Sequence, residues 1–106
     1  MEGSRYLIEM LLPLTANDGT PFGEGVFAAT RAELTERFGG LTAHLRAPAR
    51  GLWKTDAGEL SRDDVVIFEV MSETLDRVWW EKYRARLEAR FQQDVVVVRA
   101  TAMTML

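Results

Sequence analysis

The chain has 106 residues, of which 47% are apolar and 27% are charged, and it contains no cysteine and one histidine, His44. This length and composition fit a single globular domain over residues 1–106, and they exclude a disordered chain, a disulfide scaffold and a thiolate metal site. The formal net charge of −3 offers no overall attraction to nucleic acid or to anionic lipid. We therefore expect no nucleic-acid partner, no cofactor and no bound metal.

Membrane insertion and export are not expected either. The stretch from Met10 to Asn17 carries no charge, but Pro13 breaks it, and it is far shorter than the roughly 20 residues that span a bilayer. Glu2 and Glu9 interrupt the basic start and the apolar stretch that a signal peptide requires. We expect a cytoplasmic protein.

The first elements along the chain are a strand and a helix. Residues 5–13 are short, apolar and end at a proline, which predicts a strand. Residues 25–38 predict a helix, because large apolar side chains recur at helical spacing and Gly39 follows as a left-handed cap. The recurring positions are Phe27, Leu34 and Phe38.

Two strands follow the first helix. Residues 41–46 resume extended character and, after the interruption at Pro48, continue over residues 50–55, which predicts a broken edge strand. Residues 64–71 form a β-branched and aromatic run whose only charge after its first residue is Glu69. This run predicts a buried strand.

The last elements are a helix and a strand. A helix is predicted over residues 75–92, capped by Ser72 or Thr74, because four large apolar groups fall on one helical stripe. These groups are Trp80, Tyr83, Leu87 and Phe91. Residues 95–106 predict a closing strand that is apolar on both faces.

The predicted order of elements is strand, helix, strand, strand, helix, strand. Two interleaved βαβ units with right-handed crossovers give an α+β sandwich, with a four-stranded antiparallel sheet in the order 4-1-3-2 and both helices on one face. Echoes between the two halves support this arrangement, since Arg37-Phe38 recurs as Arg90-Phe91, and Glu9 and Glu69 follow similar apolar pairs.

Strand alternation predicts the two faces of the sheet. The fully apolar sets, such as Tyr6, Ile8, Met10 and Leu12, should face the helices. The open face then carries a second apolar set around Glu9 and Glu69, made of Leu7, Leu11, Val65, Ile67 and Met71. A monomer seldom exposes so large an apolar patch, and most soluble oligomers are twofold dimers, so we predict a homodimer through the open face.

The segment after the first predicted helix reads Arg37-Phe38, then Gly40-Leu41-Thr42, then Gly51-x-Trp53 and a turn that ends at Gly58. This pattern resembles a family of short bacterial proteins of unknown function. At the level of the fold, the chain resembles ferredoxin-like proteins of the dimeric α/β-barrel group. That resemblance implies two four-stranded sheets packed face to face around a central cavity.

Two carboxylates are the first candidates for chemistry. Glu9 and Glu69 should lie on adjacent central strands, about 5 Å apart if the register matches. Paired carboxylates can act as acid and base. The alternative is that each forms an ordinary cross-strand ion pair, one with Arg99 and the other with Arg46, Arg50 or Lys54.

His44 is the only side chain that ordinarily titrates near neutral pH, so it is the simplest general base. Cofactor-free oxygenases and related enzymes of the dimeric barrel group use a His, Tyr, Asn or Trp that lines the cavity. The resemblance therefore implies His44, Tyr6 and Trp53 as site residues. Arg99 is a further candidate for contact with a ligand.

Two other functions fit the predicted topology less well. Residues 22–27 resemble the anion-binding loop of acylphosphatases, but Ala28 stands where that family has its phosphate-binding arginine. RNA-recognition modules need two or three exposed aromatics on the central strands, where this chain has only Tyr6 and Phe68.

The sequence thus leaves two hypotheses for function. The first is a small homodimer that binds a small ligand between its sheets or acts as an interaction module. The alternative is a cofactor-free enzyme, oxygenase-like or isomerase-like, with His44 as base and with Glu9 or Glu69 setting the charge state of the imidazole. A cavity beside the glutamates would make a ligand plausible.

Overall fold

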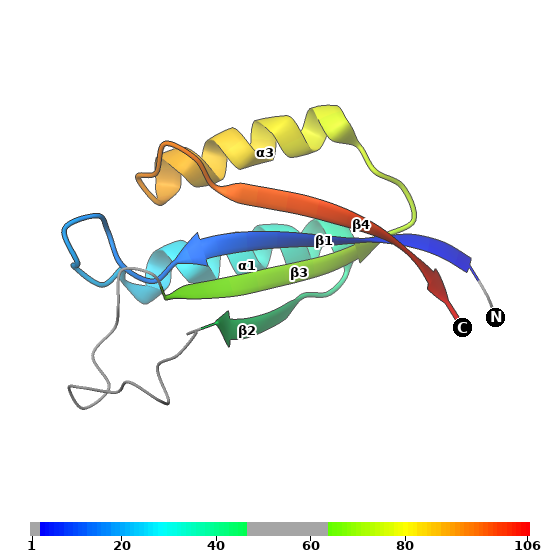
Figure 1. The fold of residues 1–106 in the computed structure, drawn as a ribbon, viewed down its shortest axis with the longest axis horizontal. Coiled ribbons are helices and arrows are strands. Elements are labelled where there is room, and N and C mark those ends of the chain that lie inside the picture. The colour runs from blue at the N-terminus through cyan, green and yellow to red at the C-terminus, as the bar shows by residue number, and fades with distance from the viewer. Residues whose placement is uncertain (1–2, 47–63) are drawn as a thin grey trace.

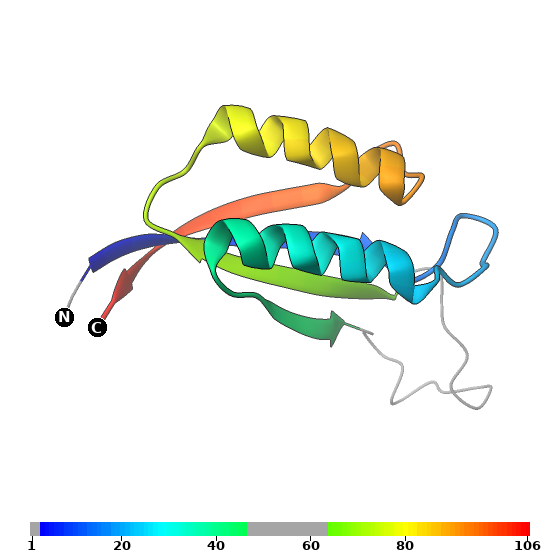
Figure 2. The ribbon, with the colours of Figure 1, turned by 180° about the vertical axis from the view of Figure 1, so that it is seen from behind.

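The computed structural model describes residues 3–46 and 64–106. The elements in chain order are β1 (Gly3–Pro13), α1 (Glu24–Phe38), β2 (Thr42–Arg46), β3 (Val65–Ser72), α3 (Arg77–Arg90) and β4 (Val97–Met105). The strands form one antiparallel sheet in the order β2-β3-β1-β4, and the helices lie on the same side of it (Figures 1 and 2). The predicted α+β sandwich with ferredoxin-like βαββαβ topology is confirmed.

The bounds of these elements differ little from the predicted ones. Each described strand or helix begins and ends within two residues of the range expected from the sequence. The predicted continuation of the edge strand beyond Pro48 lies outside the described residues. Neither described helix is long and apolar enough to cross a membrane.

The helix ends confirm one predicted cap and correct another. Gly39 ends α1 with φ 80°, in the left-handed region that glycine adopts without strain. The prediction of Ser72 or Thr74 as the cap of the second helix is wrong, because Asp76 takes that role and accepts a hydrogen bond from the Trp79 N–H at 3.1 Å. The Ser72 hydroxyl instead accepts from the Thr74 N–H, so it serves the turn that leaves β3.

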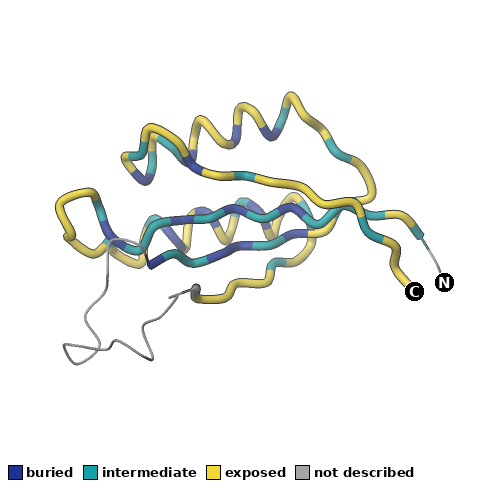
Figure 3. Tube along the Cα trace, viewed as in Figure 1, coloured by how far each residue is buried: buried dark blue, intermediate teal, exposed yellow. Residues whose placement is uncertain are grey.

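The core lies between the helices and one face of the sheet. The predicted helix-facing residues of β1 and β3 are buried, except for Tyr6 and Val66, which are partly buried, and the stripe of α3 is buried (Figure 3). Aromatic rings join the layers: Phe27 of α1 contacts Phe68 of β3 and Phe91 after α3, while Trp80 of α3 stacks on Phe38 at 5.4 Å. This packing covers one face of the sheet, and no described helix or strand covers the other face.

Candidate functional site

The open face of the sheet carries a row of charged side chains, which we call the charged row: Arg99, Glu9, Glu69 and His44. The register places Glu9 directly between Arg99 on β4 and Glu69 on β3, as the sequence predicted. His44 on β2 lies opposite Ile67, so it meets Glu69 diagonally. Because strand residues two apart share a face, all four side chains belong to the same side of the sheet.

Each glutamate of the charged row has a nitrogen-bearing neighbour on an outer strand. The Arg99 Nε–H donates to Glu9 Oε1 at 3.0 Å, and His44 Nε2 lies 3.2 Å from Glu69 Oε1. The glutamate side chains are 16% and 20% exposed, whereas Arg99 and His44 are both 48% exposed. The carboxylates therefore lie toward the middle of the face, with Arg99 and His44 at its borders.

The ion-pair alternative from the sequence is thus confirmed for Glu9. For Glu69 the expected partners were Arg46, Arg50 or Lys54, and the structure shows a further neighbour, His44. The side chain of Arg46, and all of Arg50 and Lys54, lie outside what the structure describes.

Carboxylates and an imidazole are the side chains that most often serve as acid and base. Directly opposed carboxylates repel each other, and the Arg99 guanidinium offsets part of the charge of Glu9. Across residues 3–46 and 64–106, no group of three or more His, Cys, Asp or Glu side chains could hold a metal ion.

Apolar side chains surround the charged row. Met71 is 51% exposed and Val97 is 47% exposed, while Leu7 and Leu11 are partly buried. Ile67 is only 4% exposed although it faces away from the helices. The register places Ile67 between Leu11 and His44, at the middle of the face.

A pocket of about 590 Å³ adjoins the charged row. Residues of β1 and β3 and the link from α1 to β2 line it, and Glu69 is among them. This pocket belongs to a single chain and lies beside Glu69 but not Glu9, so the expected cavity between two sheets stays a prediction.

The remaining sequence candidates do not gather at this pocket. Tyr6 points to the helix side of the sheet and packs against the core, so it lies across the sheet from Glu9 and Glu69. Trp53 lies outside the described residues. Another pocket, of about 350 Å³, lies between α3 and β4, and of the described candidates only Arg99 lines it. We therefore place the candidate site at the pocket that includes Glu69.

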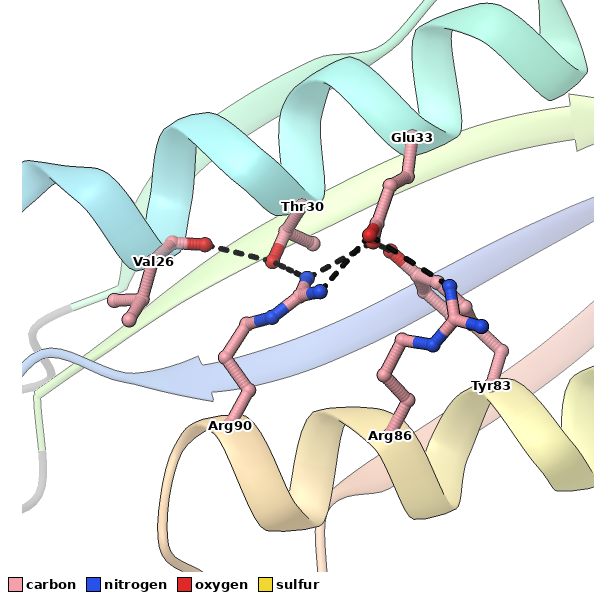
Figure 4. A network of polar contacts seen from close by, with 6 residues as sticks. All are labelled: Val26, Thr30, Glu33, Tyr83, Arg86 and Arg90. Carbon is pink, nitrogen blue, oxygen red and sulfur yellow. Dashed lines mark hydrogen bonds and ion pairs between the residues drawn. The ribbon is translucent and has the colours of Figure 1, made fainter.

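A second polar cluster, which the sequence analysis did not predict, joins the two helices (Figure 4). Arg90 on α3 holds both carboxylate oxygens of Glu33 on α1, each at 2.9 Å, and its Nη1 also donates to the Thr30 hydroxyl at 2.8 Å. The Tyr83 hydroxyl donates to Glu33 Oε1 at 2.8 Å. We call these four residues the helix clamp.

The charges of the helix clamp stabilise the contact between α1 and α3. The hydrogen bonds from Arg90 hold the pKa of Glu33 below its ordinary value, and the same bonds raise the pKa of Arg90. Burial, together with the bond to Glu33, raises the pKa of Tyr83, so its phenol stays a donor. With every member engaged, the clamp presents no free acid or base. The sequence did hold a signal for the clamp. Thr30 and Glu33 are three residues apart, so they share one side of α1, and that side faces α3.

Comparisons with family models, with curated proteins and with solved structures find no match to this chain. The ferredoxin-like topology stands on the order and pairing of the strands. The finer resemblance to dimeric α/β barrels and to a bacterial family stays a prediction.

Proposed function

We propose that the protein is a homodimer in which the open faces of two copies pack against each other, and that it binds a small ligand between the sheets or acts as an interaction module. One observation carries this proposal. The open face combines exposed apolar side chains, such as Met71 and Val97, with charges that already have partners within the same chain.

Internal pairing of the charges is what makes this face suitable for burial. Moving an unpaired carboxylate out of water costs several kcal/mol, whereas a carboxylate that already accepts a hydrogen bond from a cation loses much less. Glu9 accepts from Arg99, and Glu69 has His44 beside it. A partner that supplies only apolar contacts can therefore cover the row, and a second copy offers such contacts through its own leucines and methionines.

Light scattering over a tenfold dilution near micromolar concentration tests the proposal on the wild type and on Leu7→Arg. The wild type should have the mass of a dimer. Leu7→Arg should have the mass of a monomer, because the arginine places a charge on the apolar part of the face. Val78→Arg is the matched control, since Val78 is an exposed apolar residue of α3 far from the open face. A monomeric wild type, or a dimer that only Val78→Arg splits, would refute the proposal.

The distance between His44 and Glu69 favours a second candidate function, a cofactor-free enzyme. His44 Nε2 lies 3.2 Å from a carboxylate that lines a pocket of about 590 Å³. In this candidate His44 is the general base, and Glu69 rather than Glu9 stabilises the imidazolium that forms, because Glu9 is bonded to Arg99.

The enzyme candidate predicts that His44→Ala abolishes any activity found in a substrate screen. The melting temperature should stay within a few degrees of the wild type, because His44 is an exposed residue of an edge strand. A rate unchanged by the substitution would dismiss His44 as the base.

A further inference from the structure

The pocket beside the charged row is apolar over most of its wall and acidic at one point. Leu7, Phe38, Leu41 and Met71 contribute apolar side chains. Glu69 is the only charged side chain among its described lining residues. A ligand that fills the pocket must therefore present apolar surface to most of the wall and a group that satisfies a carboxylate at one end.

The backbone adds to the negative potential of the pocket. Helix α1 ends at Phe38, and Gly39 and Gly40 line the pocket without side chains. The Gly39 N–H satisfies the carbonyl of Thr35 at 2.8 Å. The carbonyls beyond it belong to the last turn of a helix, which lacks internal partners and carries the negative end of the helix dipole.

Two neighbouring arginines are engaged away from this pocket. Arg37, in the last turn of α1, lies 3.7 Å from a carboxylate oxygen of Asp76, and its guanidinium sits over the Trp79 ring at 4.1 Å. Arg5, farther along β1, pairs with Glu73 at 3.3 Å. His44 approaches Glu69 Oε1 from β2 and does not line the pocket.

We propose that this pocket binds small molecules in which a protonated amine is joined to an apolar body. The ammonium group pairs with the Glu69 carboxylate and with carbonyls at the end of α1, and the apolar body packs between Leu7, Phe38 and Met71. This inference rests on the ligand-binding part of the proposed function and does not require the second copy, because one chain supplies all the described residues that line the pocket. It narrows the ligand class to amines and excludes carboxylates and phosphates.

Three probes with one aromatic body test the chemistry of the head group: 2-phenylethylamine, 2-phenylethanol and 3-phenylpropanoate. Each is titrated at neutral pH into the uniformly ¹⁵N-labelled full chain, and the amide signals of Gly39, Gly40 and Thr42 are followed by NMR. The amine should shift these signals with a dissociation constant on the order of 1 mM, as expected for a ligand of this size. The alcohol should bind more weakly, and the carboxylate should not bind.

Substitutions separate the contributions of charge and volume. Glu69→Gln keeps the shape of the side chain and should weaken binding of the amine about tenfold, the usual effect of losing a charge-assisted hydrogen bond. Glu9→Gln is the matched control, because Glu9 carries the same charge on the neighbouring strand but does not line the pocket. It should weaken binding less than Glu69→Gln does, because it removes a charge that lies one strand away from the ammonium group.

Gly40→Leu tests whether the pocket itself holds the probe. A Cβ at Gly40 meets no atom within 4 Å, and the backbone there is not in the left-handed region, so a leucine fits at this wall of the pocket without backbone strain. Binding of the amine should be lost. Gly25→Leu is the control, since Gly25 also faces open space but lies at the start of α1, and it should bind as the wild type does.

The outcomes distinguish this inference from the proposed dimer when light scattering is run on the same samples. A monomer that binds the amine at Gly39 to Thr42 supports the amine site and refutes the dimer. A dimer whose signals ignore all three probes refutes the amine site and leaves the dimer. Stronger binding of the carboxylate than of the amine, or equal binding by Glu69→Gln and the wild type, also refutes the amine site.

Discussion

The two faces of one sheet have different composition and different exposure, although they come from the same strands. On β1, Ile8, Met10 and Leu12 face the helices and are almost completely buried. Leu7 and Leu11 alternate with them, face the other way and remain partly exposed. On the two central strands the helix side carries no charged side chain, while the open side carries Glu9 and Glu69. Alternation therefore separates a face that stabilises the fold from a face that is available for binding.

Carboxylate–cation pairs occur on both sides, and their placement decides what they do. The helix clamp of Thr30, Glu33, Tyr83 and Arg90 lies between two elements of the same chain, where Arg90 binds Glu33 through both oxygens. The charged row lies on a face that no described element covers, and its cations are half exposed. The polar groups of the clamp bond to one another. The charged row, in contrast, keeps exposed surface that a ligand or a partner could contact.

The largest expected effect contrasts two leucines of β1. Leu12→Ala removes a fully buried side chain from the core and should lower the free energy of unfolding by about 2–5 kcal/mol. Leu7→Ala removes the same atoms from the open face and should lower it by less than about 1.5 kcal/mol at a concentration where the chain is monomeric. Urea unfolding of both variants measures the difference. Equal losses would mean that the two faces contribute alike to the folded monomer.

The features that sequence could predict are those set by periodicity. Alternation gave the correct face for each residue of β1 and β3, and helical spacing gave the buried stripe of Trp80, Tyr83 and Leu87. The pairing of Glu9 with Glu69 and with Arg99 followed from the strand order, because those residues lie directly opposite one another.

The features that the sequence could not predict depend on side-chain conformation, on the docking of the helices and on the exact ends of the elements. His44 meets Glu69 diagonally, so its pairing depends on side-chain conformation as well as on strand register. Glu33 and Arg90 are 57 residues apart and meet only after both helices have docked on the sheet. The cap of α3 is similar, since Ser72 or Thr74 was expected, and Asp76 takes the role because the helix begins two residues later than predicted.

The second prediction tests the clamp on the covered side. Arg90→Met keeps much of the side-chain volume but leaves Glu33 with the Tyr83 hydroxyl as its hydrogen-bond donor and with Arg86 at 3.6 Å. The free energy of unfolding should fall by about 1–3 kcal/mol, because hydrogen bonds to a charged group are lost in a partly buried site. Urea unfolding at neutral pH measures the loss, and Arg84→Met, on the exposed side of α3, is the matched control. Equal effects of the two variants would contradict the role of the clamp.

The pH dependence of the clamp has a defined sign. The pKa of Glu33 in the folded protein lies below its ordinary value of 4.5, chiefly through the hydrogen bonds from Arg90. The stability that this carboxylate contributes is therefore present above the unfolded pKa and lost as the pH falls through the folded one. On acidification below about pH 5, the wild type should lose more of its stability than Glu33→Gln does. Parallel curves for the two proteins would exclude this contribution.

The smallest expected effect is on the open side, where the charged row balances repulsion against attraction. Arg99→Met leaves Glu9 directly opposite Glu69 without the cation that contacts Glu9 at 3.0 Å. The loss of unfolding free energy should be about 0.2–1 kcal/mol at low salt, the usual range for exposed cross-strand pairs, and should shrink at high salt. Adding Glu9→Gln to Arg99→Met removes one of the opposed carboxylates and should restore most of that loss. A double-mutant cycle by urea unfolding measures the coupling, and a double variant no more stable than Arg99→Met would show that repulsion between the two glutamates is negligible. In that case Arg99 would not be needed to stabilise the folded chain, and its guanidinium could bind a ligand instead.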